Sequence, residues 1–398
     1  MLKVLVVMPC YYPALNYGGP VIAVHEMNKA LIEMGIEVTV YTTNANEPGK
    51  LDVPLGKEID VDGVKVIYFP LSIAKKYFYA PLLSYALRKN VKDFDLVHIN
   101  WLYVYTTMAA AKQCARQKVP YILTPHGMLD TFSISLKGSI KKKLYLSLIE
   151  KAHIMNASYV HFSSQGEKNE AVTKAWQTNS IVIPNGVAIS SLATAPQYDK
   201  LFLKYPELFR KKIVLFLGRL NYIKGLDLLL KAWPIVVGRV KNAHLVIAGP
   251  DDNGYMGKLK AIADDEGITG QVTFTGMTLG KEKETLLNLS NVFVSSSYLE
   301  SFGMAIVEAM SHAIPVVITD RVNIKAEILE AGAGLISSCD PKNIATKIIY
   351  LLENEEDAIK MGLRGKTLVQ NRFEMDLVVR EMIACYKNVS ECADEPVY

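Results

Sequence analysis

Short runs of valine, isoleucine and leucine alternate along the chain with longer amphipathic stretches, and this alternation restricts the possible fold more than any other feature. Apolar runs at residues 4–8, 38–42 and 96–99 are separated by segments with helical periodicity, such as residues 21–34. Strands that are apolar on both faces and alternate with helices indicate a parallel sheet covered by helices on both sides. The chain is therefore predicted to belong to the α/β class.

The alternation is interrupted once, near the middle of the chain. Residues 188–210 carry little periodicity and are rich in turn-forming residues, which is typical of a linker, and the alternation resumes at Ile213. A chain of 398 residues also exceeds the usual size of one domain. We predict two Rossmann-like, doubly wound domains that face each other across a cleft, residues 1–195 and 205–373, followed by a helix over 374–398.

Composition limits the partners and the compartment. The 44 basic and 40 acidic residues leave a net charge of only +4, so nucleic acid is not expected as a partner. The five cysteines show no C-x-x-C pair and no zinc spacing, which is typical of a reducing compartment. The first apolar run ends at Pro9 without a cleavage site, and no uncharged apolar run reaches membrane-spanning length. We expect a cytoplasmic protein.

The most informative segment for function covers residues 295–319. Glu300 follows a predicted strand, and Glu308 lies within the helix that comes next. At the start of that helix, the N–H groups of Gly303 and Met304 and the positive helix end would bind phosphate oxygens. Because the helix is otherwise apolar, the Glu308 carboxylate needs a polar partner such as ribose hydroxyls. The alternative is that both acids only stabilise the start of an ordinary helix.

A second element, G-R-L-N-Y-I-K-G at residues 218–225, lies between a predicted strand and a predicted helix. It carries two cations, Arg219 and Lys224, between glycines that let the backbone approach a ligand. The arginine can hold a phosphate with two hydrogen bonds, and the lysine acts as a point charge. The alternative is a pair of solvated loop cations.

Two weaker motifs follow predicted strands in the N-terminal half. Gly18 and Gly19 precede the helix over 21–34 and would let a loop approach a ligand. Residues 124–128 are T-P-H-G-M and place His126 at the end of a strand, where it could hydrogen-bond a donor sugar or assist the acceptor. Taken alone, the glycines are equally typical of a turn, and the histidine of a buried polar group with satisfied hydrogen bonds.

Together these motifs resemble the signature of retaining glycosyltransferase family 4, whose members have the GT-B fold. Glu300 and Glu308 have the Glu-x7-Glu spacing of that signature. The other similar stretches, in the family's order, are Gly18-Gly19, T-P-H-G at 124–127, I-P-N-G-V at 183–187 and the element at 218–225. The resemblance covers nearly the whole chain and is of the type found in bacterial polysaccharide and O-antigen synthesis.

The resemblance implies a role for each cation and acid of the C-terminal half. Arg219 and Lys224 would clamp the donor diphosphate. Glu308 would hold the ribose hydroxyls, and Glu300 would bind hydroxyls of the transferred sugar. Because the cations would neutralise the leaving diphosphate, no metal ion and no other cofactor is expected.

The resemblance also implies roles for backbone groups and for the N-terminal half. Gly303 and Met304 would donate N–H groups to phosphate or sugar, and Gly19 would face the diphosphate. His126 would lie by the sugar at the reaction centre, and the C-terminal helix would return to the N-terminal domain. The implied reaction retains the anomeric configuration, because the acceptor attacks from the face that the diphosphate leaves.

The predicted function is transfer of a sugar from a nucleotide sugar, with a UDP-sugar favoured, to a saccharide acceptor, taken to be lipid-linked, in polysaccharide or O-antigen synthesis. Two alternatives stay open at this point. A sugar-nucleotide epimerase could share the fold and the diphosphate clamp, but it needs further acid–base residues that the sequence does not clearly offer. A non-enzymatic two-domain binder of sugars or nucleotides would usually act outside the cytoplasm and carry a signal peptide.

Two D-x-D patterns suggest a different chemistry. Metal-dependent glycosyltransferases of the other major fold bind a divalent ion and the diphosphate through such acids, which follow a strand. Here Asp93 and Asp95 precede a predicted strand, and Asp60 and Asp62 lead into a turn at Gly63. We predict turn acids rather than metal ligands.

A basic amphipathic segment covers residues 136–152, with leucines beside Lys137, Lys141, Lys142 and Lys143. Such a helix suits an anionic membrane surface, to which each lysine adds about 1 kcal/mol of attraction. Aromatic side chains in residues 73–83 would add an anchor. We predict peripheral attachment to the inner face of the cell membrane, and the alternative is a solvated helix with one face in the core.

Overall fold

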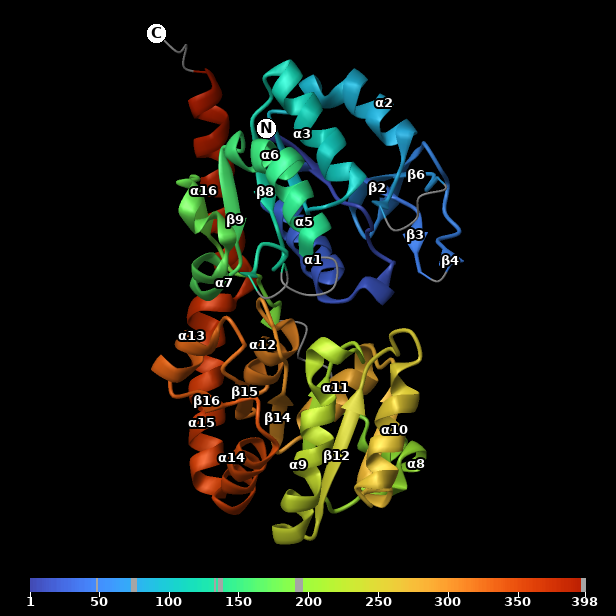
Figure 1. Cartoon of the computed structure of the whole chain (residues 1–398), viewed down its shortest axis with the longest axis vertical. Coiled ribbons are helices and arrows are strands. Elements are labelled where there is room, and N and C mark those ends of the chain that lie inside the picture. The colour runs from blue at the N-terminus through green and yellow to red at the C-terminus, as the bar shows by residue number, and fades with distance from the viewer. Residues whose placement is uncertain (48, 73–76, 132–133, 135–138, 190–195, 395–398) are drawn as a thin grey trace. The chain divides into compact units, whose positions relative to one another are not determined.

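The computed structural model describes residues 1–47, 49–72, 77–131, 134, 139–189 and 196–394, and these form two compact units (Figure 1). The N-terminal unit comprises Met1–Gly186 and Met375–Tyr398, and the C-terminal unit comprises Val187–Glu374. The chain thus leaves the N-terminal unit earlier than the predicted boundary at residue 195. Of the predicted linker, residues 190–195 lie outside the described residues.

The N-terminal unit contains an eight-stranded sheet in the order β10-β9-β8-β7-β1-β2-β6-β5. β5 runs antiparallel to β6, and the other pairings are parallel. The strands of the unit, including the separate pair β3 and β4, are β1 (Lys3–Val7), β2 (Glu37–Thr43), β3 (Ala45–Asn46), β4 (Gly49–Lys50), β5 (Glu58–Val61), β6 (Val64–Phe69), β7 (Leu96–Asn100), β8 (Tyr121–Thr124), β9 (Tyr159–Phe162) and β10 (Ser180–Val182).

Strand β1 shows why the sequence of this sheet is apolar at every position. Val4 and Val6 belong to one core cluster, whereas Leu5 and Val7 belong to a second cluster on the other face. A strand buried on both faces has no solvent side, so the alternation of polar and apolar residues disappears. The covering helices are α1 (Gly19–Glu33), α2 (Pro81–Asn90), α3 (Tyr105–Gln117), α5 (Ser139–Tyr145), α6 (Lys151–Met155) and α7 (Gln165–Glu170).

The last helix of the chain, α16 (Met375–Asp394), belongs to the N-terminal unit. Its residues Val378, Met382 and Tyr386 lie in the same core cluster as Val4 of β1. Figure 1 shows this helix, in red, alongside the strands of the unit. The N-terminal core is therefore completed by residues from the other end of the chain.

The C-terminal unit contains a six-stranded parallel sheet in the order β13-β12-β11-β14-β15-β16. Numbered within the unit, this is the strand order 3-2-1-4-5-6 of a Rossmann sheet. The strands are β11 (Lys212–Leu217), β12 (Ala243–Ala248), β13 (Val272–Gly276), β14 (Val292–Ser295), β15 (Val316–Thr319) and β16 (Gly334–Ser337). The helices are α8 (Tyr198–Lys204), α9 (Leu226–Arg239), α10 (Tyr255–Asp265), α11 (Gly280–Leu289), α12 (Met304–Ser311), α13 (Lys325–Glu330), α14 (Pro341–Glu353) and α15 (Glu355–Leu368).

The predicted alternation of strands and helices is confirmed, with one difference in the stretch taken as a linker. Residues 198–208 contain α8 and a short 3-10 helix, Pro206–Leu208. Leu201 and Leu208 are buried in the core of the C-terminal unit. A helix of seven residues is too short to produce a visible apolar period, which is why the sequence pattern missed it.

The basic amphipathic segment is helical where it is described. Helix α5 continues without a break through a π-helical stretch, η4 (Leu146–Glu150), into α6. Ile140, Leu144 and Leu148 recur every fourth residue and are 81%, 58% and 71% exposed. Lys137, like residues 73–76 of the predicted aromatic anchor, lies outside the described residues.

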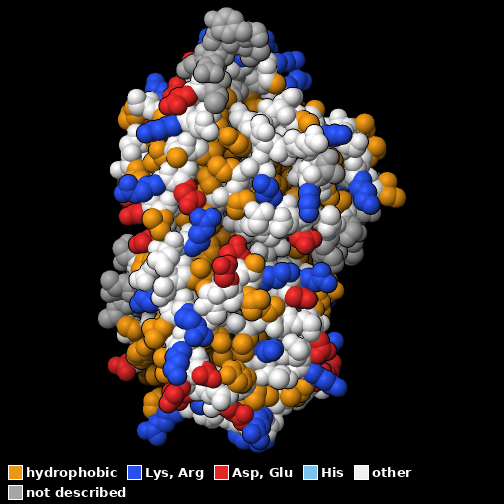
Figure 2. Space-filling model, turned by 90° about the vertical axis from the view of Figure 1, so that its left-hand side faces the viewer, with side chains coloured by type: hydrophobic (Ala, Val, Ile, Leu, Met, Phe, Trp, Pro, Cys, Tyr) orange, Lys and Arg blue, Asp and Glu red, His pale blue; other side chains and the backbone are white. Residues whose placement is uncertain are grey.

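Basic and acidic side chains are interspersed on the face of the molecule that Figure 2 shows. This distribution agrees with the small net charge of +4. Among the residues with a described position, no helix combines the length and the apolar character needed to cross a membrane.

Candidate functional site

Two loops of the C-terminal unit meet where the strand order reverses. The chain runs from β11 outward to β12 and β13 and then returns to β14 on the other side of β11. Ligands of doubly wound sheets bind at such a switch point, beyond the carboxyl ends of the strands. The loops that follow β11 and β14 are residues 218–225 and 296–303, and these contain the predicted residues Arg219, Lys224, Glu300 and Gly303.

Gly225 allows these two loops to touch. A Cβ atom on this residue would lie 2.0 Å from the carbonyl oxygen of Ser296, and its φ of +62° is one that other residues rarely adopt. The Tyr298 N–H donates to the carbonyl of Ile223 at 2.8 Å, and the Ser296 hydroxyl donates to the carbonyl of Lys224 at 3.1 Å. The backbone of Lys224 is therefore fixed against the loop that carries Glu300.

Lys224 and Glu300 form an ion pair between the two loops. Lys224 ends a short 3-10 helix, η8 (Tyr222–Lys224), and its Nζ donates to Oε2 of Glu300. The side chains are only 23% and 16% exposed. Water screens a pair this sheltered less than a surface pair, so the two charges interact strongly.

Gly303 places the start of α12 beside this pair. Its φ is +85°, and a Cβ atom there would lie 2.6 Å from Cδ1 of Ile306 and 3.2 Å from Cγ of Glu300. The N–H groups of Ile306 and Val307 donate to the Gly303 carbonyl, which leaves the earlier Met304 N–H as one of the donors that a helix start does not satisfy internally. The positive end of α12 thus lies next to the Glu300 side chain.

Arg219 pairs with an acid from a third loop. Its Nε lies 3.7 Å from Oδ2 of Asp252, which follows β12, and the side chains are 37% and 26% exposed. Asn221 also donates to Oδ2 of Asp252, at 3.4 Å. The longer distance and greater exposure make this pair weaker than the one between Lys224 and Glu300.

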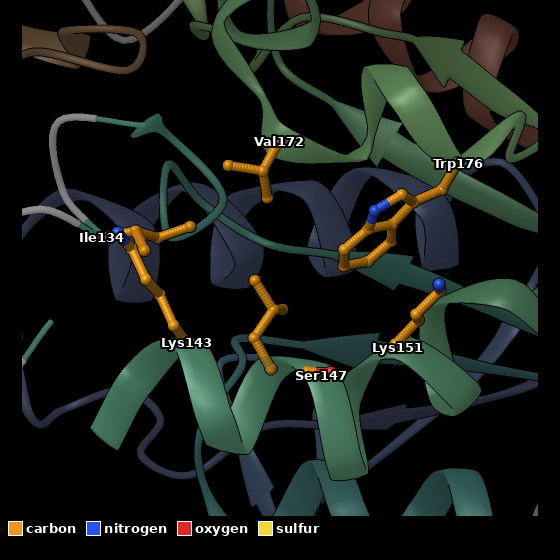
Figure 3. Close-up of a pocket in the computed structure, with 7 residues that line it drawn as sticks. Ile134, Lys143, Ser147, Lys151, Val172 and Trp176 are labelled. Carbon is orange, nitrogen blue, oxygen red and sulfur yellow. The ribbon is translucent and has the colours of Figure 1, made fainter. Parts of the chain in front are cut away.

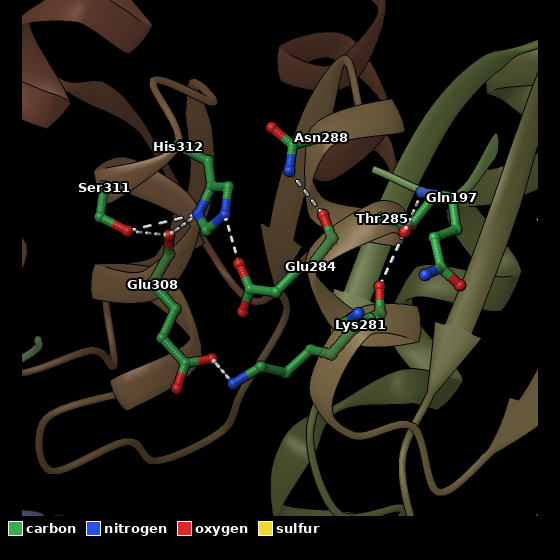
Figure 4. Close-up of polar contacts among 9 residues, drawn as sticks. Gln197, Lys281, Glu284, Thr285, Asn288, Glu308, Ser311 and His312 are labelled. Carbon is green, nitrogen blue, oxygen red and sulfur yellow. Dashed lines mark hydrogen bonds and ion pairs between the residues drawn. The ribbon is translucent and has the colours of Figure 1, made fainter. Parts of the chain in front are cut away.

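Glu308 has a basic partner that the sequence did not suggest. Its Oε2 accepts a hydrogen bond from Nζ of Lys283, on α11, at 3.1 Å. Figure 4 shows the Glu308 side chain reaching from α12 toward α11. The neighbours Val307 and Ala309 are fully buried, so this carboxylate is the polar group of an apolar helix.

Three cations of the candidate site in the C-terminal unit are thus each bound to a carboxylate: Arg219 to Asp252, Lys224 to Glu300 and Lys283 to Glu308. Cations of this kind bind phosphate oxygens, and carboxylates accept hydrogen bonds from sugar hydroxyls. A ligand that carries both groups can bind Lys224 through its phosphate and Glu300 through its hydroxyls, so that neither charge of this pair is left without a counterpart.

In the N-terminal unit, Gly18 and Gly19 lie after β1. The sheet extends from β1 in both directions, to β2 on one side and to β7 on the other. Gly18 precedes α1 with a φ of +82°, and Gly19 is the first residue of the helix. The loop thus ends at a helix start, at the switch point of the N-terminal sheet.

His126 is held in one tautomer by a residue of the neighbouring strand. Its Nε2 lies 2.8 Å from Oδ1 of Asn100, the last residue of β7, so Nε2 carries the proton and Nδ1 can accept a hydrogen bond. Burial, together with the nearby His161, lowers the pKa of His126 to about 3. The ring is neutral at physiological pH.

Glu167 holds the backbone of the loop that carries His126. Its carboxylate accepts hydrogen bonds from the N–H of Gly127 at 2.6 Å and from the N–H and hydroxyl of Ser163 at 2.8 and 2.6 Å. Glu167 is 3% exposed, and burial raises its pKa. The φ of +49° at His126 is thus supported on both sides, by Asn100 and by Glu167.

A cavity of about 240 Å³ lies beside the basic helical segment (Figure 3). Its lining residues are Ile134, Lys143, Leu146, Ser147, Lys151, Val172 and Trp176. The ammonium group of Lys151 lies 5.5 Å from the centre of the Trp176 ring. The cavity combines apolar walls with two cations and no acid among its lining residues.

Three of the four D-x-D acids have partners in the N-terminal unit, and Asp60 and Asp62 lie in a turn. Asp95 accepts a hydrogen bond from the N–H of Lys3 at 2.6 Å, and Asp60 accepts one from the N–H of Gly63 at 3.0 Å. Asp62 has a φ of +52° in the same turn and lies 3.3 Å from Nε2 of His25. Asp60 thus stabilises its own turn, whereas Asp95 and Asp62 contact residues distant in sequence.

The structure brings some of the predicted residues together and leaves others apart. Lys224, Glu300 and Gly303 are direct neighbours, whereas Arg219 and Glu308 lie in the same unit with partners of their own. Gly18, Gly19 and His126 belong to the N-terminal unit.

Sequence reasoning missed the partners Asp252, Lys283, Asn100 and Glu167. Asn100 ends β7 and Asp252 follows β12 by a few residues, so both stand at carboxyl ends of strands, the position that pointed to Lys224. Lys283 and Glu167 lie on helices, and nothing in their local sequence distinguishes them from solvated surface residues.

Two protein-family models match the chain, one for each half. The model described as Glycosyltransferase Family 4 matches residues 17–191, and the model described as Glycosyl transferases group 1 matches residues 199–368. The gap between the two matches lies close to the point at which the chain enters the C-terminal unit.

Curated relatives match over most of their length. A phosphatidyl-myo-inositol mannosyltransferase of Mycolicibacterium smegmatis is 26% identical over 390 residues, which cover 96% of this chain and 93% of the relative. A mannosylfructose-phosphate synthase of Agrobacterium fabrum is 24% identical over 342 residues, which cover 77% of this chain and 72% of the relative.

Solved structures share the fold. A sucrose-phosphate synthase from Thermosynechococcus elongatus superposes with a TM-score of 0.80 at 20% identity, covering 98% of this chain and 100% of the other. HepE of Anabaena, solved in complex with UDP and glucose, gives a TM-score of 0.77 at 17% identity with the same coverage.

Proposed function

Because the chain belongs to the GT-B glycosyltransferases of the group 1 family and transfers sugar from a nucleotide-sugar donor, we propose that it uses a UDP-sugar, retains the anomeric configuration and needs no metal ion. The acceptor we propose is a lipid-linked saccharide of cell-surface polysaccharide or O-antigen synthesis. HepE of Anabaena binds UDP in its solved structure, which supports UDP as the nucleotide of the donor.

The observation that carries the proposal is the ion pair between Lys224 and Glu300 beside the start of α12. A nucleotide sugar presents a diphosphate and the sugar hydroxyls close together. Lys224 and the N–H groups at Gly303 and Met304 would take the phosphate oxygens, with Arg219 as a second cation. Glu300, freed from Lys224, would accept hydrogen bonds from the sugar.

The same groups would stabilise the transition state. As the bond between the anomeric carbon and the phosphate oxygen breaks, negative charge grows on the diphosphate and positive charge on the sugar ring. Preplaced cations near the diphosphate therefore act more strongly on the transition state than on the ground state. A metal ion is not required for that charge balance.

The neutral state of His126 supports a front-face route. A group whose pKa is about 3 is a weak base at pH 7 and is poorly suited to take the proton of an acceptor hydroxyl. In the proposed step, the acceptor oxygen bonds to the anomeric carbon on the face that the diphosphate leaves, and its proton passes to the departing phosphate oxygen. His126 would hydrogen-bond the sugar through Nδ1.

The basic helical segment supports a lipid-linked acceptor. Ile140, Leu144 and Leu148 present an apolar row to solvent next to Lys142 and Lys143, a combination that suits an anionic membrane surface. The neighbouring cavity has apolar walls and lysines at its edge, so it suits a molecule with an apolar body and an anionic group. We propose that this side of the N-terminal unit meets the membrane and the acceptor lipid.

The stereochemistry of the product tests the central part of the proposal. UDP-, GDP- and ADP-sugars are incubated with the enzyme and short-chain polyprenyl-diphosphate saccharides in the presence of EDTA, and the product is analysed by NMR. We expect transfer from a UDP-sugar with the anomeric configuration of the donor. An inverted product, or transfer that requires added magnesium or manganese, would contradict the mechanism.

Vesicle flotation tests the membrane part separately. The wild type is expected to bind vesicles that contain phosphatidylglycerol, and the double variant Leu144→Ser, Leu148→Ser to bind them at least about 10-fold more weakly. Leu363→Ser, which changes a 53% exposed leucine of α15, is the matched control. If the wild type does not bind these vesicles, the proposed membrane attachment is wrong, whereas the proposed transfer reaction is not affected.

A further inference from the structure

A series of contacts connects the backbone of Glu308 with its own side chain through His312, Glu284 and Lys283 (Figure 4). His312 follows the last residue of α12, and its Nδ1 lies 2.9 Å from the backbone carbonyl oxygen of Glu308. Its Nε2 lies 2.8 Å from Oε2 of Glu284, on α11. The residue next to Glu284 is Lys283, whose Nζ lies 3.1 Å from the carboxylate of Glu308. The series of contacts thus begins at the backbone of Glu308 and ends at its side chain.

His312 lies between two hydrogen-bond acceptors. A backbone carbonyl and a carboxylate both accept hydrogen bonds, so each ring nitrogen of His312 faces an acceptor. Ser311 also donates its hydroxyl to the Glu308 carbonyl, at 2.6 Å, so it does not supply a proton to Nδ1.

The contact between His312 and Glu284 ties α11 to α12. The side chains are 4% and 17% exposed, so the pair is well shielded from water. The hydrogen bond from His312 lowers the pKa of the Glu284 carboxyl, which remains ionised near neutral pH. Because Lys283 precedes Glu284 on the same helix, any shift of α11 against α12 would also move Lys283 away from Glu308.

We propose that Lys283, Glu284 and His312 are positioning residues that fix the carboxylate of Glu308 for the ribose of the nucleotide donor. The inference rests on the proposed function, in which Glu308 receives the ribose hydroxyls. A free glutamate side chain must be ordered when the ribose binds, and this ordering weakens binding. Lys283 holds one carboxylate oxygen in place in advance, and the pair of Glu284 and His312 holds Lys283.

The selectivity of the enzyme for ribose over deoxyribose measures this positioning. The affinity of the best binder among UDP, GDP and ADP is compared with that of its 2′-deoxy analogue by calorimetry. A hydrogen bond from a hydroxyl to a well-placed carboxylate gives the wild type a preference of about 10-fold for the ribonucleotide. The variants are Lys283→Ala, His312→Gln and Glu284→Gln. The control is Lys281→Ala, which changes an exposed lysine of α11.

In the three variants we expect the preference to fall to about 2-fold, with the affinity for the deoxynucleotide nearly unchanged and the KM for the donor raised while kcat stays within about 2-fold. The control should keep the wild-type preference. A general loss of stability would weaken both nucleotides equally, so it cannot imitate this result.

Two failures are distinguishable. If the wild type binds no nucleoside diphosphate, the proposed donor site itself is wrong. If the wild type prefers the ribonucleotide and all three variants retain that preference, the positioning role is overturned and the donor site stands. Glu284→Gln keeps the size of the side chain, so a folding defect in one of the other variants does not remove the test.

Discussion

The two units use the same architecture and satisfy the polar groups beyond their strands in different ways. In the C-terminal unit the polar side chains are ionised and paired, as in Lys224 with Glu300 and Lys283 with Glu308. In the N-terminal unit they are mostly neutral, with His126 bonded to Asn100. Ionised side chains can bind a charged ligand, whereas neutral hydrogen bonds hold a backbone in place. The charged donor is therefore expected to bind the C-terminal unit.

The neutral network of the N-terminal unit crosses its sheet. His98 on β7 lies 2.6 Å from the hydroxyls of both Tyr386, on α16, and Thr124, on β8. Thr124 lies 2.9 Å from His161 on β9, and the other nitrogen of His161 donates to the Ile183 carbonyl at 2.8 Å. Burial lowers the pKa of His98 well below its usual value and that of His161 to about 4. The last helix is thereby tied to three strands.

The largest effect is expected at the ion pair between Lys224 and Glu300. Lys224→Ala removes the cation and leaves Glu300 without its partner, so kcat/KM should fall by about 10³-fold, as when a single charge-stabilising donor is removed from an active site. Steady-state kinetics with saturating acceptor measure it. Lys231→Ala, an exposed lysine of α9, serves as the control and should stay within about 2-fold of the wild type. Equal losses in both variants would show that the site does not depend on this pair.

The close approach of the two loops predicts a loss of stability in the C-terminal unit. In Gly225→Ala the new methyl group would overlap the Ser296 carbonyl, and the unfolding free energy should fall by about 3 kcal/mol. Gly257→Ala is the matched control, because this glycine is exposed on α10 with open space around its Cβ position, and it should be neutral or stabilising by up to about 1 kcal/mol. Urea unfolding measures both. Similar stability of the two variants would rule out the loop contact.

Acid should destabilise the N-terminal unit more than the C-terminal unit. His98, His126 and His161 have folded pKa values lowered from the ordinary 6.5, so the unfolded chain takes up protons first as the pH falls. Their neutral forms cost no stability above pH 6.5. At pH 5, His126 and His161 each lower the unfolding free energy by about 2 kcal/mol, and His98 acts in the same direction. In the C-terminal unit the pKa of His244 is lowered in the same way, to about 4.

Hydrogen–deuterium exchange, measured for individual peptides, distinguishes the acid sensitivity of the two units. Between pH 7 and pH 5, after correction for intrinsic rates, protection in β7, β8 and β9 should fall further than protection in β11 and β14. Equal losses in the two sheets would contradict the contrast between neutral and ionised networks.

The smallest effect is expected at the edge of the histidine network. Tyr386→Phe removes the hydroxyl next to His98 and leaves a buried ring nitrogen without a partner, which should cost about 1 kcal/mol of stability. Nucleotide affinity should not change, because the donor residues belong to the other unit. Urea unfolding and a nucleotide titration test the two statements, and a drop in affinity of more than about 5-fold would contradict the division of roles between the units.

The fold could be predicted because both sheets are buried on both faces, so each strand appears as a continuous apolar run. The donor residues could be located because glycines and charges directly follow those strands, as at Gly225 and Lys224. The helix α8 could not be found, because it is too short to show a period. The pairing of Glu308 with Lys283 could not be found either, since it depends on how α11 packs against α12.

The charge state of His126 could not be predicted from the sequence either. It depends on Asn100 and His161, which come from neighbouring strands of the sheet and lie 26 and 35 residues away along the chain. A lone histidine after a strand has the sequence signature of a general base and of a neutral hydrogen-bonding group alike. Only its surroundings in three dimensions separate the two.

The central claim is that the nucleotide donor separates Lys224 from Glu300 and binds to both residues. Hydrogen–deuterium exchange of the whole chain, with and without saturating UDP, tests it most directly. We expect new protection in residues 218–225 and 296–308, and no such protection in Lys224→Ala at the same UDP concentration. Binding of UDP that leaves these two segments unchanged, or protects them equally in the variant, would contradict the account.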